Sequence, residues 1–187
     1  MHWLIRSVAI LKRDYPDVKL RIARSTLLDP KKNSVINLLK RNNYSRYLSV
    51  LIRKMKLWKN VIPLGNLDEN QMAQELKNAH VFVLPSEIEN SPNSLAEAML
   101  VGTPSVVSFV GGTQSMIKDG ETALCFPRGD YAVMAECIKS IFSNDSLAVK
   151  LSDKARDIAH FRHCRDRIAS DTVSIYHDII KKSKMSS

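Results

Sequence analysis

The sequence predicts an α/β fold in which helices cover both faces of a parallel β-sheet. Short apolar segments alternate along the chain with longer segments whose apolar residues recur at helical spacing. One short segment, 81–84, is wholly apolar, which is typical of an inner parallel strand covered on both faces. The 187 residues suffice for one such domain with a real core. We therefore interpret 1–187 as a single domain.

The expected helices follow from apolar residues that recur at helical spacing. They cover 2–13, 34–57 with a break near 41–43, 68–77, 93–101, a short segment after 111–112, 130–143, 145–160 and 164–182. The expected strands are short apolar or alternating segments bounded by turn residues. They cover 18–23, 60–64, 81–84, 105–109 and 123–126. The helix over 164–182 with the polar tail to 187 is expected to close the domain.

Individual residues set several of these boundaries. Pro16 ends the first helix, because proline disfavours helix at the residue before it. Asp68 is a suitable N-cap for the helix that follows. Gly102 suits the end of the helix over 93–101, and Asp29-Pro30 marks a loop over 25–34.

Cysteine usage and hydropathy indicate the cellular compartment of the protein. The cysteines are odd in number, widely spaced and form no CxxC pair; they are Cys125, Cys137 and Cys164. The histidines do not show the HxxxH spacing of zinc ligands. No apolar run approaches the ~20 residues needed to span a bilayer. We therefore expect a cytoplasmic protein with free thiols and no bound metal.

The positive charge is concentrated in residues 1–60, which carry 15 Lys and Arg residues against three acids. A basic region of this kind can attract nucleic acid, anionic lipid or a phosphorylated substrate, or it can be a solvated surface. Its aromatic residues fall at helix positions and not on a strand platform for stacking bases, so nucleic-acid binding is not expected. Peripheral contact with the inner face of a membrane and a solvated helix face both remain open.

Two carboxylates flank a predicted helix start. Glu89 lies in the loop that follows the strand over 81–84, and Glu97 lies one turn inside the helix that begins near Asn93. The helix start offers unpaired N–H groups and a positive dipole end, which suit a phosphate group. Carboxylates beside it suit the hydroxyl groups of a ribose or another sugar. The same two residues could also be solvated surface glutamates.

The ordered motifs resemble glycosyltransferase family 4. In that family two glutamates separated by seven residues follow a Pro-Ser step and end in Glu-Ala-Met, as in the segment from Pro85-Ser86 to Glu97-Ala98-Met99. The resemblance continues along nearly all of the chain. It includes Val61 to Gly65, Gly111-Gly112, Lys118 to Thr122, Asp130 and the segment from His163 to Ile180. It implies that the chain is the C-terminal, Rossmann-like half of a GT-B fold enzyme. The chain would lack the first strand of that half.

The resemblance also implies the roles of the site residues. Glu97 would bind the ribose of a nucleoside-diphosphate sugar, and Glu89 would contact its sugar as the catalytic carboxylate. The backbone amides of Asn93, Ser94 and Leu95 would face the diphosphate. Main-chain groups near Leu64 and Gly65 would meet the base. The implied reaction is a retaining sugar transfer to a saccharide or lipid-linked acceptor, as in bacterial polysaccharide or cell-envelope glycan synthesis. No metal cofactor is implied.

Some positions depart from the family pattern. Asn90-Ser91-Pro92 replaces the usual Gly-Phe-Gly, and Pro92 offers no N–H to a phosphate. Arg24 stands where a glycine is common, where it could contact phosphate or cap the strand end. His80 stands where Asp is common and is interpreted as structural. The family's diphosphate-clamping Arg and Lys would precede Met1, so we expect this N-terminally incomplete chain to be inactive alone and to need a further N-terminal domain.

Two other functions remain open. A nucleotide-sugar epimerase could share the same architecture, although the spacing of Glu89 and Glu97 favours a transferase. A non-catalytic module that binds nucleotide or membrane would rest on the basic charge of 1–60.

Overall fold

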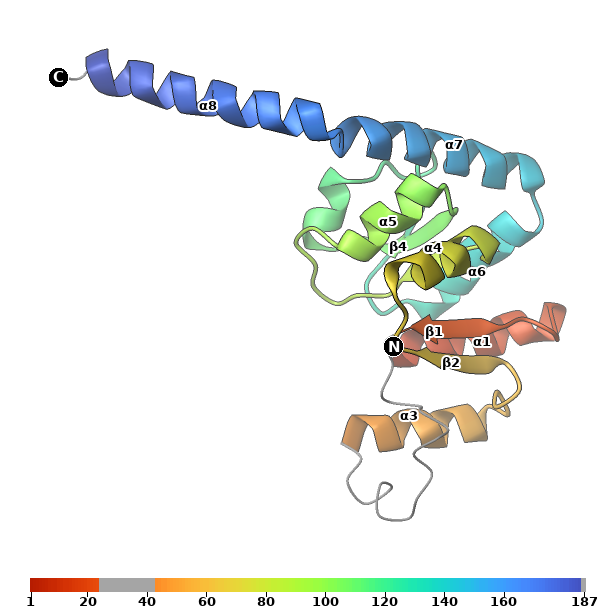
Figure 1. Ribbon diagram of the computed structural model, residues 1–187. Coiled ribbons are helices and arrows are strands. Elements are labelled where there is room, and N and C mark those ends of the chain that lie inside the picture. The colour runs from red at the N-terminus through yellow and green to blue at the C-terminus, as the bar shows by residue number, and fades with distance from the viewer. Residues whose placement is uncertain (24–42, 186–187) are drawn as a thin grey trace.

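The structure, a computed structural model, describes residues 1–23 and 43–185 (Figure 1). Its helices are α1 (His2–Asp14), α3 (Asn43–Lys54), α4 (Glu69–Asn78), α5 (Asn93–Val101), the 3-10 helix η3 (Gly111–Ser115), α6 (Tyr131–Phe142), α7 (Asp145–Arg162) and α8 (Arg165–Met185). Its strands are β1 (Leu20–Ala23), β2 (Val61–Gly65), β3 (Phe82–Leu84), β4 (Ser105–Ser108) and β5 (Leu124–Phe126). The predicted α/β class and the order of these elements are confirmed. The predicted loop 25–34, Arg24 and the first part of the helix over 34–57 lie outside the described residues.

The strands form two parallel sheets and not the single sheet that the sequence predicts. β1 pairs with β2 in one sheet, and β3, β4 and β5 pair in that order in the other. Among the described residues, β1 and β3 therefore each have one edge that pairs with no other strand. Figure 1 shows the β1–β2 pair apart from β4, with α4 lying between them in this view.

Helices cover both faces of the three-stranded sheet, as the central strand β4 shows. Val106 and Val107 are both fully buried, but they belong to different hydrophobic cores. Val106 packs into the core built by α1, α3 and α6, whereas Val107 packs into the core built by α5 and α7. Successive residues of a strand point to opposite faces, so the two cores lie on opposite sides of β4.

Strand β1 is shorter than the predicted strand over 18–23 because a buried side chain holds the residues before it. The Nδ2 of Asn60 donates to the carbonyl oxygens of Pro16 and Val18 at 3.0 and 2.8 Å. The Val18 N–H donates to the Tyr15 carbonyl at 3.0 Å. These bonds form a turn after α1, and the parallel ladder begins only at Leu20, opposite Val61.

Three helix boundaries have clear caps, of which those at Asp68 and Gly102 were predicted from the sequence. Asp68 caps α4 in a capping box with Gln71. Asp130 caps α6 by accepting hydrogen bonds from two backbone N–H groups. Gly102 ends α5 in the left-handed region at φ 85°, which glycine adopts without steric cost.

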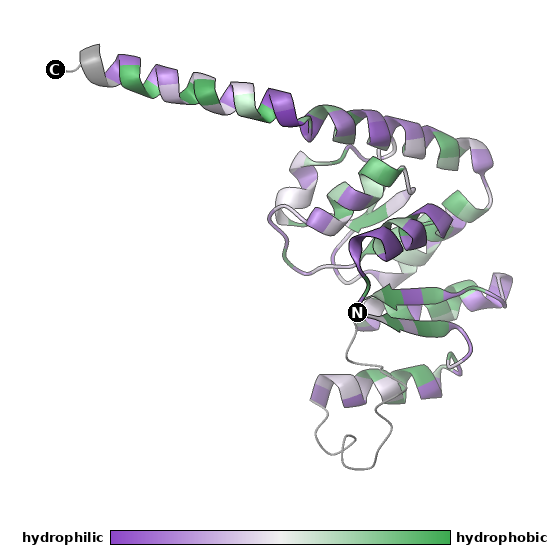
Figure 2. Cartoon of the chain, viewed as in Figure 1, coloured by the Kyte–Doolittle hydropathy of each residue, from purple (hydrophilic) through white to green (hydrophobic). Residues whose placement is uncertain are grey.

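The C-terminal helix α8 extends away from the rest of the molecule (Figure 1). Apolar and polar residues alternate along it (Figure 2). Its large apolar side chains are exposed to solvent and include Ile168, Val173, Ile175, Tyr176, Ile179 and Ile180. The predicted closing helix is therefore formed, but these apolar side chains are not buried against the rest of the described chain.

Candidate functional site

A cavity of about 530 Å³ lies between the two sheets and extends along β1 and β3 to their carboxyl ends. The free edges of β1 and β3 form its walls, and residues from β2, α4 and α5 complete it. Four of the sequence-predicted site residues line this cavity: Leu64, Asn93, Ser94 and Glu97. Leu64 comes from the carboxyl end of β2, and the other three come from the first turns of α5. Parallel α/β folds place their ligands at this end of the strands.

Unpaired N–H groups of α5 face this cavity. Pro92 is the N-cap of α5, and its carbonyl accepts the Leu95 and Ala96 amides at 3.1 and 3.2 Å. Within the described residues, the Asn93 and Ser94 amides donate to no protein group, and both residues are exposed. Two free N–H groups at the positive end of a helix dipole form a site for a phosphate group.

Leu95 differs from its two neighbours. Its side chain is fully buried in the core that contains Val107, and its amide is already bonded to Pro92. Leu95 therefore anchors the start of α5 and leaves the two preceding amides open.

Glu97 is exposed at the mouth of the cavity, one turn after Asn93. No ion pair involves Glu97 within the described part of the chain. An unpaired carboxylate next to a phosphate site can accept two hydrogen bonds from neighbouring hydroxyl groups.

Glu89 lies in the loop between β3 and α5 and does not line the cavity. Its Oε1 accepts a hydrogen bond from the Ser86 hydroxyl at 2.6 Å, and its carbonyl accepts the Gly112 N–H at 2.8 Å. The Ser86 carbonyl in turn accepts the hydroxyl of the buried Ser108 at 2.8 Å. The side chain and the backbone of Glu89 are thus both fixed in place.

The glycine pair of η3 makes this loop packing possible. A Cβ on Gly112 would lie 1.3 Å from the Asn90 carbonyl oxygen, and one on Gly111 would lie 2.2 Å from the Glu89 carbonyl oxygen. Both contacts are far shorter than any real Cβ contact. The two glycines therefore allow η3 to approach the loop that carries Glu89.

Gly65 and His80 lie away from the cavity lining. Gly65 ends β2 at φ 74°, and a Cβ there would meet no atom within 4 Å, so its conformation explains the glycine. His80 precedes β3 at the opposite end of that strand from the cavity mouth, and its ring lies 6.0 Å from that of Phe142.

An ion pair in the cavity wall was not predicted from the sequence. Arg21 of β1 donates to both carboxylate oxygens of Glu75 on α4, with its terminal nitrogen 2.7 Å from Oε1. This contact with Arg21 holds the pKa of Glu75 below its ordinary value. The two residues lie 54 positions apart in the chain, so no local pattern could have revealed the pair.

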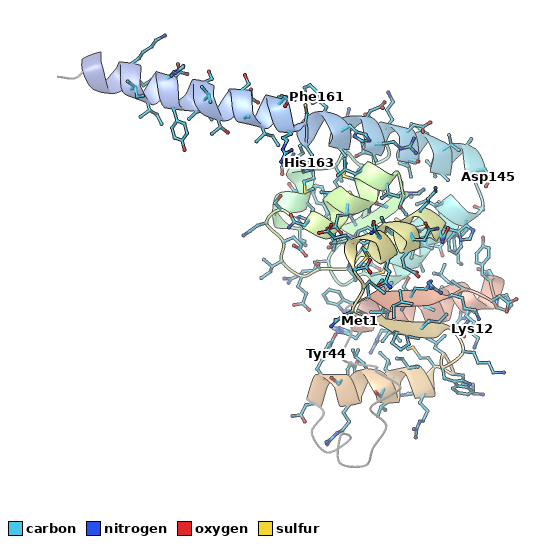
Figure 3. All side chains as sticks on the ribbon, in the orientation of Figure 1. Met1, Lys12, Tyr44, Asp145, Phe161 and His163 are labelled. Carbon is cyan, nitrogen blue, oxygen red and sulfur yellow. The ribbon has the colours of Figure 1, made fainter. Side chains whose placement is uncertain are left out.

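The start of α1 also contributes to the cavity. Met1 lines it, and burial lowers the pKa of the Met1 amine while Glu87 opposes this shift. The side chain of Tyr44 on α3 lies close to Met1 (Figure 3), where its hydroxyl accepts the His2 amide N–H at 3.2 Å. Desolvation and the nearby positive charges, including Arg6, lower the pKa of His2.

The residues described here contain no group of three or more His, Cys, Asp or Glu side chains that could hold a metal ion. Among the same residues, none of the helices combines the length and the apolar character that crossing a bilayer requires.

Comparison with known proteins places this geometry among glycosyl transferases. The family model described as "Glycosyl transferases group 1" matches residues 1–158. N-acetyl-alpha-D-glucosaminyl L-malate synthase of Bacillus anthracis is 26% identical over 134 residues, which are 72% of this chain and 35% of that protein. The capsular polysaccharide biosynthesis glycosyltransferase CapM of Staphylococcus aureus is 26% identical over 107 residues, 57% of this chain and 28% of that protein. The chain thus spans about a third of the length of such relatives.

Solved structures support the fold. Anabaena HepE in complex with UDP-glucose has a TM-score of 0.76 at 21% identity, over 93% of this chain and 45% of that one. The C-terminal domain of the group 1 family protein LpcC from Francisella tularensis has a TM-score of 0.71 at 18% identity, over 87% of this chain and 78% of that one. At these identities the likeness concerns the fold alone.

Proposed function

Because this chain belongs to the group 1 glycosyl transferase family, we propose that it binds the nucleotide-sugar donor of a retaining glycosyltransferase. The acceptor in this proposal is a saccharide or a lipid-linked saccharide, and the product is a polysaccharide or cell-envelope glycan. We further propose that the acceptor-binding part of the enzyme lies outside these 187 residues, which span about a third of the relatives' length.

One observation carries the proposal. Leu64, Asn93, Ser94 and Glu97 are separated by up to 33 positions, yet they line a single cavity at the carboxyl ends of the strands. The cavity therefore combines an apolar wall, two free N–H groups and a carboxylate. An apolar wall suits a base, free N–H groups suit a diphosphate, and a carboxylate suits the hydroxyl groups of a ribose.

The proposed chemistry is transfer of the sugar from the diphosphate to an acceptor hydroxyl. The bond between the anomeric carbon and the phosphate oxygen breaks, and a bond from that carbon to the acceptor oxygen forms. The acceptor proton passes to the leaving phosphate, so no protein nucleophile takes part. The Asn93 and Ser94 amides stabilise the negative charge that develops on the diphosphate. Glu97 holds the ribose, and Glu89 contacts the donor sugar and orients it for transfer.

We also propose that donor binding needs no metal ion. The positive end of α5 lines the cavity proposed for the diphosphate, and it would supply part of the charge that a divalent cation would otherwise supply.

Ligand-observed NMR with UDP, GDP and ADP tests the proposal on the purified chain. We expect one of the three nucleotides to bind with a Kd of roughly millimolar, the level of a few contacts without a closed cleft. Glu97→Gln should weaken that binding, whereas Glu69→Gln, an exposed acid of α4 away from the cavity, should not. Failure of all three nucleotides to bind at 10-fold above ~1 mM would overturn the proposal.

A product assay separates the transferase from an epimerase of the same architecture. The chain is incubated with UDP-, GDP- and ADP-sugars, first alone and then with saccharide acceptors. We expect neither altered sugar nor transfer at ordinary enzyme rates from the 187 residues by themselves. A changed sugar without any acceptor would identify an epimerase. Transfer at ordinary rates would show that the acceptor site lies within this chain.

Contact of α3 with an anionic membrane is a second candidate function. Tyr47 and Val50 of α3 are 43% and 60% exposed, and Trp58 in the turn after α3 is 59% exposed; the exposed bases Arg53 and Lys54 lie between Val50 and Trp58 in the sequence. Exposed aromatic and aliphatic side chains with flanking bases are typical of interfacial helices.

Flotation with liposomes tests this contact. Binding should require anionic lipid, fall as salt is raised, and weaken in Trp58→Ala relative to Val149→Ala, a control that removes an exposed apolar side chain on α7. Binding that is absent, or that does not depend on salt, would leave α3 as a solvated helix face.

A further inference from the structure

We propose that an aromatic patch formed by His2, Tyr44 and Tyr47, together with the nearby Glu87, binds a saccharide on the acceptor side of the reaction. The patch lies where the first turns of α1 and α3 meet. This role rests on the proposed sugar transfer. The patch would add a contact surface of this chain to the acceptor-binding part that is proposed to lie outside it.

The two tyrosine rings of the patch are exposed and lie nearly parallel. Tyr44 and Tyr47 are 38% and 43% exposed, their ring centroids are 6.3 Å apart and their planes differ by 27°. They lie three positions apart in α3, so both extend from the same side of that helix. Other side chains of α3 are buried in the fold, and these are Ser45, Leu48, Leu51 and Ile52. The packing of α3 therefore does not depend on the exposed ring faces.

Contacts with α1 hold both tyrosine rings in place. The Tyr44 hydroxyl accepts the His2 backbone N–H at 3.2 Å. A hydrogen bond with Tyr47 is the main cause that raises the pKa of Arg6, which lies one turn further along α1. The His2 ring meets both tyrosine rings edge-on, at centroid distances of 6.2 and 6.1 Å. The rings are therefore preorganised, and they lose little side-chain entropy when a ligand stacks on them.

An exposed aromatic surface with a carboxylate beside it suits a sugar. A pyranose ring has a face of C–H groups, which packs on the face of an aromatic ring, where the partial charge is negative. Its hydroxyl groups need acceptors, and a carboxylate supplies strong ones. Desolvation and neighbouring positive charges lower the pKa of His2 and Glu87 opposes this shift, so the Glu87 carboxylate lies near the patch. Glu87 is exposed, and no ion pair involves it within the described part of the chain.

The patch lies next to the cavity that is proposed to bind the donor. Met1 lines that cavity, and Figure 3 shows Tyr44 close to Met1. Glu87 belongs to the loop after β3 and precedes by two residues Glu89, the proposed contact of the donor sugar. A saccharide on the patch would therefore lie beside the donor sugar, as an acceptor must.

The tyrosine hydroxyls favour a saccharide over a membrane at this patch. A tyrosine in a membrane interface directs its hydroxyl to water and headgroups. Here the hydroxyl of Tyr44 is bonded to the first turn of α1, and Tyr47 is bonded to Arg6 of the same helix. The membrane contact considered above for α3 would then use Val50 and Trp58 without Tyr47.

Ring signals of ¹³C-labelled tyrosine in the purified chain test the saccharide site. The chain has five tyrosines, and Tyr176 of α8, which is 62% exposed, is an internal control. The probes are maltotriose, triacetylchitotriose and α-1,6-linked mannotriose, each added up to about 20 mM, which is twentyfold above a Kd of ~1 mM. Bicelles that contain anionic lipid are the parallel probe for a membrane.

We expect at least one of the three saccharides to shift the ring signals of Tyr44 and Tyr47 and to leave those of Tyr176 unchanged. Tyr47→Ala should weaken binding of that saccharide about tenfold, and Glu87→Gln about threefold. The matched controls Tyr176→Ala and Glu69→Gln should not weaken it. Thermal melting shows whether each variant folds, and the ring signals of the unmodified chain decide if Tyr47→Ala does not.

Three results would each overturn the saccharide site: no tyrosine shift with any of the three saccharides, equal shifts at Tyr176, or shifts with the bicelles alone. Nucleotide binding is followed separately at the amides of Asn93 and Ser94. Nucleotide binding without saccharide shifts would overturn the acceptor contact and leave the donor proposal standing. Saccharide shifts without nucleotide binding would support the patch as a saccharide site and contradict the donor proposal.

Discussion

Replacing Glu97 with Gln should weaken binding of the nucleoside diphosphate about tenfold while leaving the fold intact. Hydrogen bonds to a charged group are worth roughly 1.5–3 kcal/mol. Glu97 is exposed at the cavity mouth, so water competes for its oxygens and the lower end of that range applies. A loss of about 1.4 kcal/mol corresponds to a factor of ten. The fold should not suffer, because Glu97 makes no ion pair within the described residues and Gln has a similar helix propensity.

The assay compares the Kd of the bound nucleotide for the unmodified chain, Glu97→Gln and the control Glu69→Gln, with thermal melting of all three proteins. We expect a weaker Kd for Glu97→Gln alone and equal melting temperatures for all three. An unchanged Kd for Glu97→Gln would remove this carboxylate from the site. Equal weakening in both variants would mean that the affinity follows the overall charge of the chain and not a contact with the ribose.

Further predictions concern the sugar contact, metal, thiols and acid stability. In the complete enzyme, Glu89→Ala should lower kcat severely and barely change affinity for the free nucleotide; equal losses in both measurements would contradict the proposed contact with the sugar. EDTA should leave nucleotide affinity of the chain unchanged within about twofold, since α5 supplies positive charge at the phosphate position; a loss of binding would indicate a metal. Burial raises the pKa of the Cys125 thiol to about 12, so iodoacetamide at pH 8 should modify the exposed Cys164 first, as peptide mass mapping would show. Since Arg21 depresses the pKa of Glu75 in the folded state, the pair stabilises the fold above the unfolded pKa near 4.3, and this contribution is lost as pH falls through the folded value. The free energy of unfolding of Glu75→Gln should therefore be lower by about 0.5–1 kcal/mol at pH 7, a figure reduced for solvent screening, and should approach that of the unmodified chain as pH falls through the folded pKa of Glu75.

Local sequence patterns predicted most of the elements because their signals lie within a few residues. Asp68 caps α4, and Gly102 ends α5 at a positive φ, as their positions in the sequence indicated. The apolar segment 81–84 became β3, whose carboxyl end leads into the loop that carries Glu89.

The features that the sequence did not predict depend on contacts between distant residues. The turn that shortens β1 requires Asn60 to reach Pro16, 44 positions away. The separation of the strands into two sheets depends on which edges lie next to each other, and apolar periodicity carries no information about neighbours. For the candidate site, the helix start and its carboxylate were predicted, whereas the hydrogen bonds that hold Glu89 through Ser86 and Ser108 depend on the packing of β4 against the loop.

Mapping of the bound nucleotide onto the chain by ¹⁵N–¹H NMR tests the central claim most directly. UDP, GDP and ADP are titrated separately into the isotope-labelled chain, and the backbone amide shifts are followed residue by residue. The account predicts that the nucleotide which binds shifts the amides of Asn93, Ser94 and Glu97 most strongly, together with Leu64 across the cavity. Shifts confined to other surfaces, such as the hollow between α7 and α8 beside Phe161, would contradict it.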